Sequence, residues 1–519
     1  MTSKFEMERA RLGLTRRNVL QGTAALGGAM ILGGRSAFAQ TPQKGGTLRL
    51  CYPNPVDQLD PLATLSTGGQ QFAAAIFDKL TDIGPDGFEV IPRLATSWSP
   101  ENNGQEWVFE LRQGVKFHDG SEFTSKDVVA TVERTLDKAR GARGYGTYGP
   151  LKEIRSEGTH RVRFVLTQPF AELPYSCGQR WASIMPAAGV DTMGEHPIGT
   201  GPFKLKDHQP GSTTTVARNE DYWMDGHPYV DEVVFVQIAE SVAQQAALRG
   251  GSVDVLNQIG VETYLSLRNA PNISAFSEPT PKYQVLFLQA NKDPFTNVKA
   301  REAFRHLIDR KGLVAAALLG EGVIGNDMPL LPTDPMIPEL PQNDQDLDKA
   351  KRLLHEAGIE NLTLDLWTTS ERPPAPKMAL AVQEGAAKIG VRINIHDIPF
   401  TQYASEVSRK EPIYTSQWSG YYSNFERLYK PYHSAGGSNY SAMETVPGLD
   451  AVLEDIIAEV DTTKRKEMIG KACSMIHTGS DRVIPYFQNL FGATTARVQG
   501  YTPPLQGLSD LRTIWLQQA

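Results

Sequence analysis

The sequence of residues 93–134 is RLATSWSPENNGQEWVFELRQGVKFHDGSEFTSKDVVATVER, and its order of parts is the most particular feature of the chain. Five parts are predicted in order: an apolar turn ending in Trp98, a polar turn at Glu101–Gln105, an alternating strand over Trp107–Arg112, a turn at Phe117–Gly120 and a capped helix from Thr124. Generic globular composition does not produce such an order. The stretch therefore indicates a defined fold.

The length of the chain predicts several domains. At 519 residues it is longer than one hydrophobic core usually serves, so we expect two or three domains. Hydrophobic residues make up 40% and charged residues 21% of the chain, a balance typical of proteins that bury large cores.

The N-terminus has the pattern of a cleaved export signal. Residues 15–20 read TRRNVL, a twin-arginine pattern, and a Gly/Ala-rich run at 22–34 and the small-residue site Ala37-Phe38-Ala39 follow. The apolar run is too short for a bilayer, which needs roughly 20 residues. We expect export by the twin-arginine route, cleavage near Ala39 and a periplasmic protein without a lipid anchor. A cytoplasmic protein with a chance arginine pair is the alternative.

Charge argues against polyanionic partners. The whole chain has a formal charge of −7, and because residues 1–39 contribute +4, the remainder carries −11. Nucleic acid and anionic membrane surfaces are therefore not expected as partners. The three cysteines, Cys51, Cys177 and Cys473, have neither CxxC nor metal-ligand spacing, and the sequence leaves open whether any pair forms a disulfide.

Periodicity predicts α/β units along the chain. Strands are predicted at Gly46–Cys51, Glu232–Gln237 and Tyr283–Asn291, and helices at Gly68–Leu80 and beyond the N-cap Asn297. The helix after Asn297 places Ala300, Ala303, Phe304, Leu307 and Ile308 on one buried face. From Asp346 a helix, a strand at Leu362–Trp367, a helix at Lys377–Ile389 and a strand at Val391–His396 alternate, which predicts a parallel sheet. Ligands bind at the carboxyl ends of such strands.

Enzymatic and metal-binding motifs are absent or defective. The sequence has no HExxH, GxSxG, Walker A or CxxC motif. The string Gly320–Gly325 matches GxGxxG, but it follows a helical run where a dinucleotide site needs a strand. Asp344, Asp346 and Asp348 resemble the start of a calcium loop, yet Lys349 and His355 stand where Gly and Glu are required. His118-Asp119 is interpreted as part of a turn. We therefore predict no catalytic residues, no metal site and no cofactor.

Four segments together resemble one known family. They are residues 93–134, the GTGPF run at 199–203, the Gly-Gly-Ser-Val-Asp turn at 250–254 and the segment NVKAREAFRHLIDRKGLV at 297–314. They resemble extracytoplasmic solute-binding proteins of ABC importers, family five, of the dipeptide/oligopeptide-binding type. The resemblance covers nearly all of the chain after the signal.

The resemblance implies both a fold and a function. The expected fold is α/β, a two-lobed periplasmic-binding-protein fold (type II, large cluster C form) with an extra domain inserted in lobe I. The expected division is a signal at 1–39, lobe I at 40–72, 198–283 and 488–519, the inserted domain at 73–197 and lobe II at 284–487. A small peptide-like or other organic solute would bind between the lobes, and a membrane permease would receive it from the protein, which is expected to be a monomer.

Candidate ligand contacts lie in the expected second lobe. Arg372, in the loop after the strand Leu362–Trp367, resembles the arginine with which dipeptide-binding relatives hold a ligand carboxylate, and its planar fork suits that group. The other candidates follow the next strand: Trp418, Ser419, Gly420, Tyr421, Tyr422 and Asn424. Peptide-binding relatives usually carry an aspartate in this region for the ligand's amino group, whereas here no Asp precedes Glu426.

That departure leaves the identity of the ligand open. The ligand is expected to lack a free α-amine, unless Glu426 replaces the aspartate. A modified peptide, an opine-like conjugate, an oligosaccharide and an aromatic acid are the alternatives, because aromatic walls suit each of them. A periplasmic sensor with the same fold is a second possibility. A secreted hydrolase is the least favoured, because it needs a nucleophile and base that no motif supplies.

Overall fold

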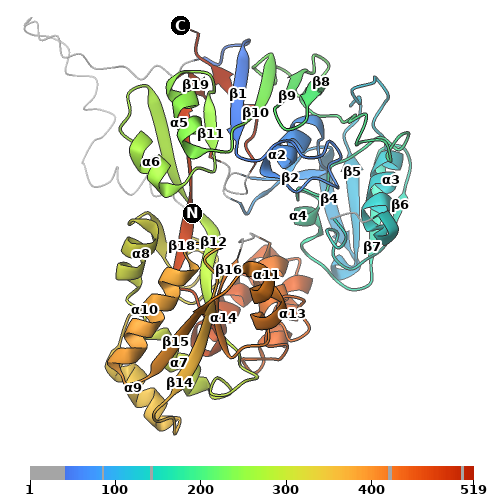
Figure 1. Cartoon of the computed structure of the whole chain (residues 1–519). Helices are drawn as coiled ribbons and strands as arrows, with labels where there is room; N and C mark the ends of the chain where they lie inside the picture. The colour runs from blue at the N-terminus through green and yellow to red at the C-terminus, as the bar shows by residue number, and fades with distance from the viewer. Residues whose placement is uncertain (1–40, 85–86, 141–143, 419–422, 504–507, 519) are drawn as a thin grey trace, which may run out of the picture. The chain divides into compact units, whose positions relative to one another are not determined.

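The computed structural model describes residues 41–84, 87–140, 144–418, 423–503 and 508–518. The helices and strands of these residues belong to one compact unit, Pro42–Ala519. They form a mixed α/β fold with one large sheet, one four-stranded sheet and two short two-stranded ribbons (Figure 1). This architecture agrees with the α/β class predicted from the sequence. The export signal lies outside the described residues.

The large sheet runs through most of this unit. Its described strands, in spatial order, are β15 (Arg392–Asp397), β14 (Thr363–Thr368), β16 (Ile413–Trp418), β12 (Ile273–Leu288), β18 (Tyr486–Thr495), β11 (Val255–Asn257), β1 (Thr47–Tyr52), β10 (Glu232–Gln237), β9 (Thr213–Arg218) and β8 (Phe203–Gln209). Two short strands also belong to this sheet: β13 (Gly322–Ile324) pairs with β18, and β17 (Arg482–Val483) pairs with β12. We call the end with β1 lobe I and the end with β14 lobe II.

Lobe I is built around β1, which pairs in parallel with β10 and β11. Alternate residues of a strand face opposite sides of the sheet, so β1 serves two cores. Leu48 and Leu50 pack with helix α2 (Thr67–Ile76), whereas Cys51 packs with α5 (Ser241–Arg249) and α6 (Val261–Leu267). The predicted strands at the start of the chain and at Glu232–Gln237 are confirmed. Helix α2 ends earlier than predicted, because Phe77 already has extended backbone angles.

Residues 93–134 form the centre of a small separate core. Strands β4 (Ala95–Glu101), β5 (Glu106–Leu111), β7 (Arg161–Leu166) and β6 (Leu151–Ser156) make the four-stranded sheet in that order, and helix α3 (Ser125–Leu136) packs against it. The strand, the turn at Phe117–Gly120 and the capped helix are confirmed, with Thr124 and Asp127 forming a capping box. The apolar turn ending in Trp98 is wrong, because Trp98 lies inside β4 and pairs with Phe109.

Lobe II contains the predicted helix–strand alternation. Strands β14 and β15 are parallel, and helices α9 (Leu347–Glu356) and α10 (Ala375–Lys388) precede and follow β14, which confirms the parallel unit. Helix α7 (Val298–Arg305) follows the predicted N-cap Asn297, and the five apolar residues predicted to form its buried face are all fully buried, although two of them lie beyond its end. It ends before Leu307, because Asp309 caps the next helix, α8 (Arg310–Leu318). Helices α13 (Leu449–Ala458) and α14 (Thr462–Gly479) pack together in a further core.

Two long antiparallel strands, β12 and β18, connect the lobes. β12 pairs with β18 over its first half and with β16 of lobe II over its second half. The register of β12 against β18 shifts between Pro279 and Tyr283, where two prolines, Pro279 and Pro281, remove backbone donors. β12 begins well before the predicted strand at Tyr283, so the sequence showed only its lobe II half.

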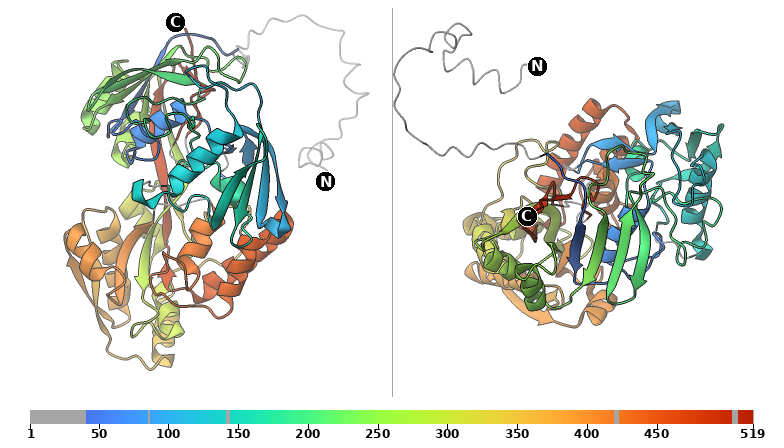
Figure 2. Two further views of the ribbon diagram at one scale, coloured as in Figure 1. Left: turned by 90° about the vertical axis from the view of Figure 1, so that its right-hand side faces the viewer. Right: turned by 90° about the horizontal axis from the view of Figure 1, so that it is seen from above.

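A second connection runs from the small separate core to lobe II (Figure 2). The Glu172 carboxylate precedes the short helix α4 (Leu173–Ser176) and accepts hydrogen bonds from Ser423 Oγ (2.5 Å) and from the backbone N–H groups of Asn424 and Phe425 (3.0 Å each). Beside it, the Ala171 N–H donates to the Ile457 carbonyl (2.7 Å), and the rings of Phe170 and Phe425 meet edge to face. These contacts join the small core to the end of α13.

Candidate functional site

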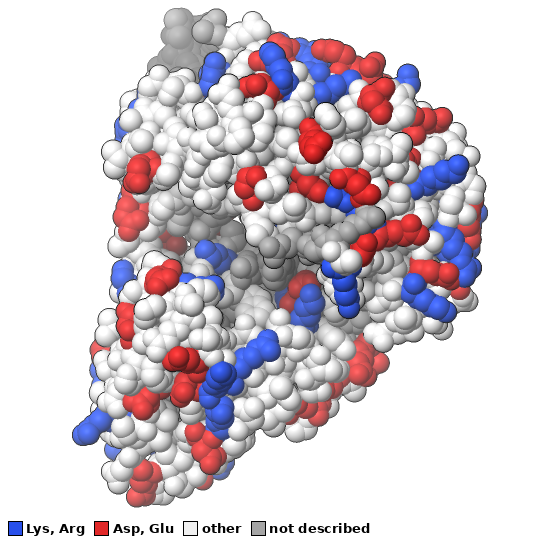
Figure 3. Space-filling view, turned by 45° about the vertical axis from the view of Figure 1, so that its right-hand side comes forward, with Lys and Arg blue, Asp and Glu red and all other residues white. Residues whose placement is uncertain are grey.

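A cavity of about 1320 Å³ lies between the lobes, next to the connecting strands. Both lobes and the small core contribute to its wall, and Figure 3 shows the surface hollowed at this level, with Lys and Arg side chains near its border. Its lining includes α2, the start of α6, the register shift of β12, the end of α8, the first turn of α10, part of β18 and the residues around 508–513. Its volume suits a small organic ligand.

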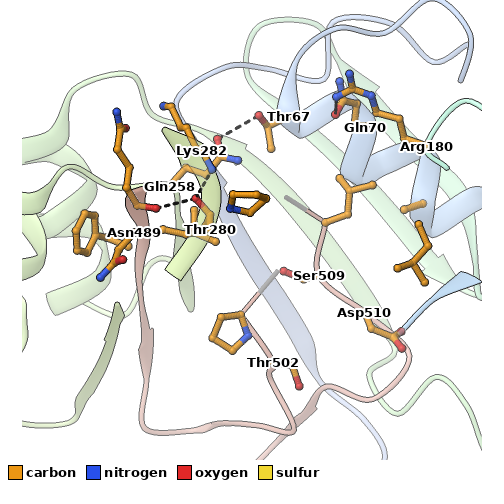
Figure 4. Close-up of a pocket in the computed structure, with 18 of the residues that line it drawn as sticks. Thr67, Gln70, Arg180, Gln258, Thr280, Lys282, Asn489, Thr502, Ser509 and Asp510 are labelled. Carbon is orange, nitrogen blue, oxygen red and sulfur yellow. Dashed lines mark hydrogen bonds between the residues drawn. The ribbon is translucent and has the colours of Figure 1, made fainter. Parts of the chain in front are cut away.

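The wall formed by the connecting strands is polar. Thr280 Oγ1 donates to the Gln488 carbonyl (2.7 Å), and the Lys282 N–H donates to Thr280 Oγ1 (3.3 Å). Facing them from lobe I, Thr67 Oγ1 donates to Gln258 Oε1 (3.2 Å). Figure 4 shows these side chains together, with Gln70 and Arg180 to one side. Buried atoms of two neighbouring amides, Gln488 Nε2 and Asn489 Oδ1, have no hydrogen-bond partner among the described residues.

A second wall carries paired charges. Asp82 contacts Lys79 Nζ (3.1 Å), Arg93 Nε (3.1 Å) and Arg512 Nη2 (3.0 Å). Burial disfavours ionisation of Asp82, but these three cations together hold its pKa well below the ordinary range. Arg512 also pairs with Asp510 (2.7 Å). The wall is therefore a network of paired charges that fixes the C-terminal segment against the small core.

Asp78 adjoins this network and is fully buried. Burial raises the pKa of its carboxyl group, while Arg512 and three hydrogen-bond donors oppose that shift. The donors are Trp223 Nε1 (2.8 Å), Thr200 Oγ1 and Tyr222 OH (3.1 Å each). Every oxygen of Asp78 is thus engaged, so this carboxyl group is a structural part of the wall.

The predicted contact Arg372 lies beside the cavity rather than in its lining. Its guanidinium carbon is 3.8 Å from the centre of the Phe400 ring, a cation–π contact. Ser370 and Pro373, in the same loop after β14, do line the cavity. The loop therefore lies where the order of strands predicts a ligand, but the Arg372 side chain points to Phe400.

The second predicted group lies at the end of β16. Trp418 pairs with Tyr283 of β12, its ring is 5.9 Å from that of Tyr440, and its buried Nε1 has no acceptor among the described residues. Ser419, Gly420, Tyr421 and Tyr422 lie outside the described residues.

The side chains of Asn424 and Glu426 of the same segment are bonded within lobe II. Asn424 is 5% exposed, and its Oδ1 accepts from Arg427 Nε (3.2 Å) and Nη2 (2.9 Å). Glu426 pairs with Lys430 (2.5 Å). The structure therefore shows Asn424 orienting Arg427, while Glu426 already has a cationic partner.

Sequence reasoning missed Lys282, Gln258 and Asp510, all of which line the cavity. No motif surrounds them, and they are distant from one another in the chain. The only signal near Lys282 is the Pro-Thr-Pro-Lys run at 279–282, which interrupts an otherwise strand-like segment.

His118 is part of a structural contact, as the sequence predicted for a turn histidine. The Gly199 N–H donates to its Nδ1 (3.3 Å), so Nε2 carries the proton that is donated to the Gly201 carbonyl (3.1 Å). Its own N–H donates to the Gly199 carbonyl (2.9 Å). The Phe117–Gly120 turn thus docks on the GTGPF run.

The remaining sequence candidates have structural roles in the described residues. Asp346 caps α9 through the Lys349 N–H (2.8 Å), and Gly320 ends α8 with a positive φ of +85° before β13. The three cysteines are buried and free, and burial raises the pKa of Cys51 to about 11.

Among the described residues, no cluster of three or more His, Cys, Asp or Glu could hold a metal ion, and no helix is long and apolar enough to span a membrane.

Fold and cavity together define a two-lobed α/β protein with a cavity between its lobes. The chain belongs to the bacterial extracellular solute-binding proteins, family 5, whose middle region matches residues 89–440. It is accordingly a solute-binding component of an ABC importer, in a family that binds small peptides or other solutes outside the cytoplasm and works with membrane permeases.

Three known proteins show the range of this similarity. The chain is 26% identical to a dipeptide-binding protein of Escherichia coli strain K12, over 88% of this chain and 92% of that one. It is also 26% identical to heme-binding protein A of Haemophilus influenzae, over 82% and 84%. The solved structure of DppA from Helicobacter pylori in complex with the peptide STSA has 26% identity and a TM-score of 0.73, over 92% and 99%. The names show different ligands, so family membership alone leaves the ligand open.

Proposed function

We propose that this protein captures an organic solute without a free α-amine in the cavity between its lobes and delivers it to a permease. The observation that carries this proposal is the position of the cavity, because its wall comes from both lobes and from the connecting strands. A ligand that contacts both lobes favours the arrangement in which they approach each other. Binding would therefore be coupled to hinge motion.

The expected absence of an amine follows from the charges after β16. No aspartate lies between Trp418 and Glu426 in the sequence, and Glu426 already pairs with Lys430. An ammonium group buried without a counter-charge is disfavoured by several kcal/mol. A modified peptide, an opine-like conjugate, an oligosaccharide or an aromatic acid therefore suits the site better than a free peptide.

Arg372 and Trp418 are the ligand contacts that we propose from lobe II. Arg372 shares its loop with Ser370 and Pro373 of the cavity wall, so rotation of its side chain away from Phe400 would bring the guanidinium toward a ligand. Trp418 also lies outside the cavity lining, and its buried indole N–H, next to Tyr283, has no partner among the described residues. Both side chains suit an acid group beside a flat apolar surface.

Export and assembly complete the proposal. The twin-arginine pattern and the Ala37-Phe38-Ala39 site support cleavage near Ala39 and a periplasmic location. We propose that the protein acts as a monomer. The separate cores support the division proposed from the sequence, with an inserted domain at 73–197 between two parts of lobe I.

A thermal-shift screen of the purified protein tests the ligand class. Free dipeptides, N-acetylated dipeptides, opine-like conjugates, oligosaccharides and aromatic acids are compared. A ligand at about a hundredfold over its Kd adds roughly 2.7 kcal/mol and raises the Tm visibly. We expect shifts with amine-free compounds, and a smaller shift for the best acid with Arg372→Ala. Tight binding of unmodified dipeptides would contradict the missing-amine proposal, and an unchanged shift would exclude Arg372.

A further inference from the structure

Lys282 occupies a special position in the connecting strand β12. It lies within the register shift between Pro279 and Tyr283, where pairing with β18 is interrupted. Register shifts of this kind turn a side chain out of the regular alternation and often occur next to binding sites. Lys282 lines the cavity, and Figure 4 shows it with Thr280 and Gln258.

The cavity that Lys282 lines has an excess of cationic residues. In the part of the chain that the structure describes, the cavity is lined by Lys79, Arg93, Arg180, Lys282, Lys377 and Arg512, and by Asp78, Asp82, Glu262 and Asp510. Cations therefore outnumber acids there, although the whole chain has a formal charge of −7.

The other lining cations have partners. Asp82 binds Lys79, Arg93 and Arg512, Lys377 Nζ donates to the Ala316 carbonyl (2.8 Å), and Arg180 Nη1 donates to Gln70 Oε1 (3.3 Å). The Lys282 Nζ atom has neither an ion pair nor a hydrogen bond to any described residue, which distinguishes it from these five.

Partial desolvation distinguishes Lys282 from a fully solvated surface lysine. Lys282 is exposed to the space of the cavity, yet the surrounding protein lowers the pKa of its ammonium group through desolvation. A partly desolvated cation without a partner is unfavourable, and an incoming anion would relieve that cost. Gln488 of the same wall has a buried donor, Nε2, that has no partner among the described residues.

We propose that Lys282 binds a carboxylate of the transported solute at the connecting strands, and thereby selects organic acids over their neutral analogues. This inference rests on the proposed function, because it needs a solute in the same cavity. It adds a contact that is independent of Arg372, whose guanidinium lies on Phe400. A carboxylate held at β12 would touch the strand about which the lobes move.

Matched acid and amide probes test this inference. Isothermal titration measures the Kd of N-acetyl-alanyl-phenylalanine and its C-terminal amide, of benzoate and benzamide, and of glutarate and glutaramide. The unmodified protein should bind the acid of at least one pair roughly ten- to a hundredfold more tightly than the amide, the range of a charge-assisted hydrogen bond. Lys282→Gln should reduce that ratio to about one and leave the amide Kd unchanged, whereas Lys282→Arg should keep the preference.

Control variants separate this inference from the function on which it rests. Lys351→Gln, an exposed lysine of α9 outside the cavity lining, should keep the acid preference. Because the Lys282 side chain makes no bond to the described residues, Lys282→Gln should keep the Tm of the unmodified protein. If Lys282→Gln retains the preference, or if the unmodified protein binds acid and amide equally, the role of Lys282 is excluded while the solute-binding proposal stands. If no acid or amide binds to any variant, both proposals fail.

Discussion

At the scale of single residues, His118 of the stretch 93–134 holds its turn against the GTGPF run at 199–203. Burial lowers the pKa of His118 to about 4, and Lys204 adds to that effect, against the Gly201 carbonyl and Asp119. The neutral ring accepts from the Gly199 N–H, and protonation of Nδ1 would break that bond. The folded protein therefore favours neutral His118.

The sign of this shift predicts a loss of stability in acid. The pKa of His118 is lower in the folded protein than the ordinary value near 6.5. Its contribution to the free energy of unfolding is therefore complete above about pH 6.5 and is lost as the pH falls toward 4. We expect roughly 2–3 kcal/mol to be lost over that window. Urea unfolding at pH 7 and pH 4.5 measures it.

Two variants isolate the part that belongs to His118. His118→Gln should weaken the pH dependence of the unfolding free energy, whereas the same substitution at the exposed His196 should leave the dependence unchanged. Equal dependence in the unmodified protein and in His118→Gln would contradict this explanation.

At the scale of elements, the acidic run before α9 is a helix cap. The Asp346 side chain accepts from the Lys349 N–H, and Asp348 lies in the first turn, where the helix dipole favours a negative charge. Gly358, with a positive φ of +71°, follows the end of the helix. Local capping thus accounts for residues that resemble part of a calcium loop.

This interpretation predicts a specific pair of results. Asp346→Ala should lower the unfolding free energy by about 1 kcal/mol, the usual cost of a lost N-cap, whereas Asp344→Ala should change it by less than about 0.5 kcal/mol. Millimolar calcium should not alter the Tm of the unmodified protein. A calcium-dependent increase that Asp346→Ala abolishes would instead show that the run binds the ion.

At the scale of the whole described unit, the small core contacts lobe II through Glu172. Its carboxylate accepts three hydrogen bonds from the segment that follows the proposed contacts at Trp418, and Glu172 is 5% exposed. The lobes are therefore linked by β12 and β18 and also by this buried contact. Any hinge motion has to accommodate both connections.

Removal of the carboxylate should weaken this link. Glu172→Ala leaves the backbone N–H groups of Asn424 and Phe425 without their acceptor, and each unsatisfied buried donor costs about 1–3 kcal/mol. We expect a lower Tm and faster hydrogen exchange at these two amides, measured by mass spectrometry of the overlapping peptides. Glu133→Ala, an exposed glutamate on α3, is the matched control and should change neither quantity. Unchanged exchange in Glu172→Ala would show that the contact is not maintained in solution.

The sequence predicted those parts of the fold that depend on local patterns. The strand at 107–112, the caps at Thr124, Asn297 and Asp346, and the parallel unit of lobe II follow from periodicity and capping chemistry. The prediction failed where the bounds of a strand depend on pairing with another strand. Trp98 lies in a strand because it pairs with β5, and β12 extends back to Ile273 because β18 lies beside it.

For the site, the sequence predicted the loop after β14, and the tertiary structure places Ser370 and Pro373 of that loop, but not Arg372, in the cavity wall. The position of Arg372 after a parallel strand is a consequence of strand order, so it could be predicted. By itself the sequence determined the family, the α/β units and the net charge, since each is encoded in composition or in short patterns. Only the tertiary structure decided which side chains share the cavity and that Lys282 has no partner among the described residues, because residues far apart in the chain meet only after folding and burial depends on all of them at once.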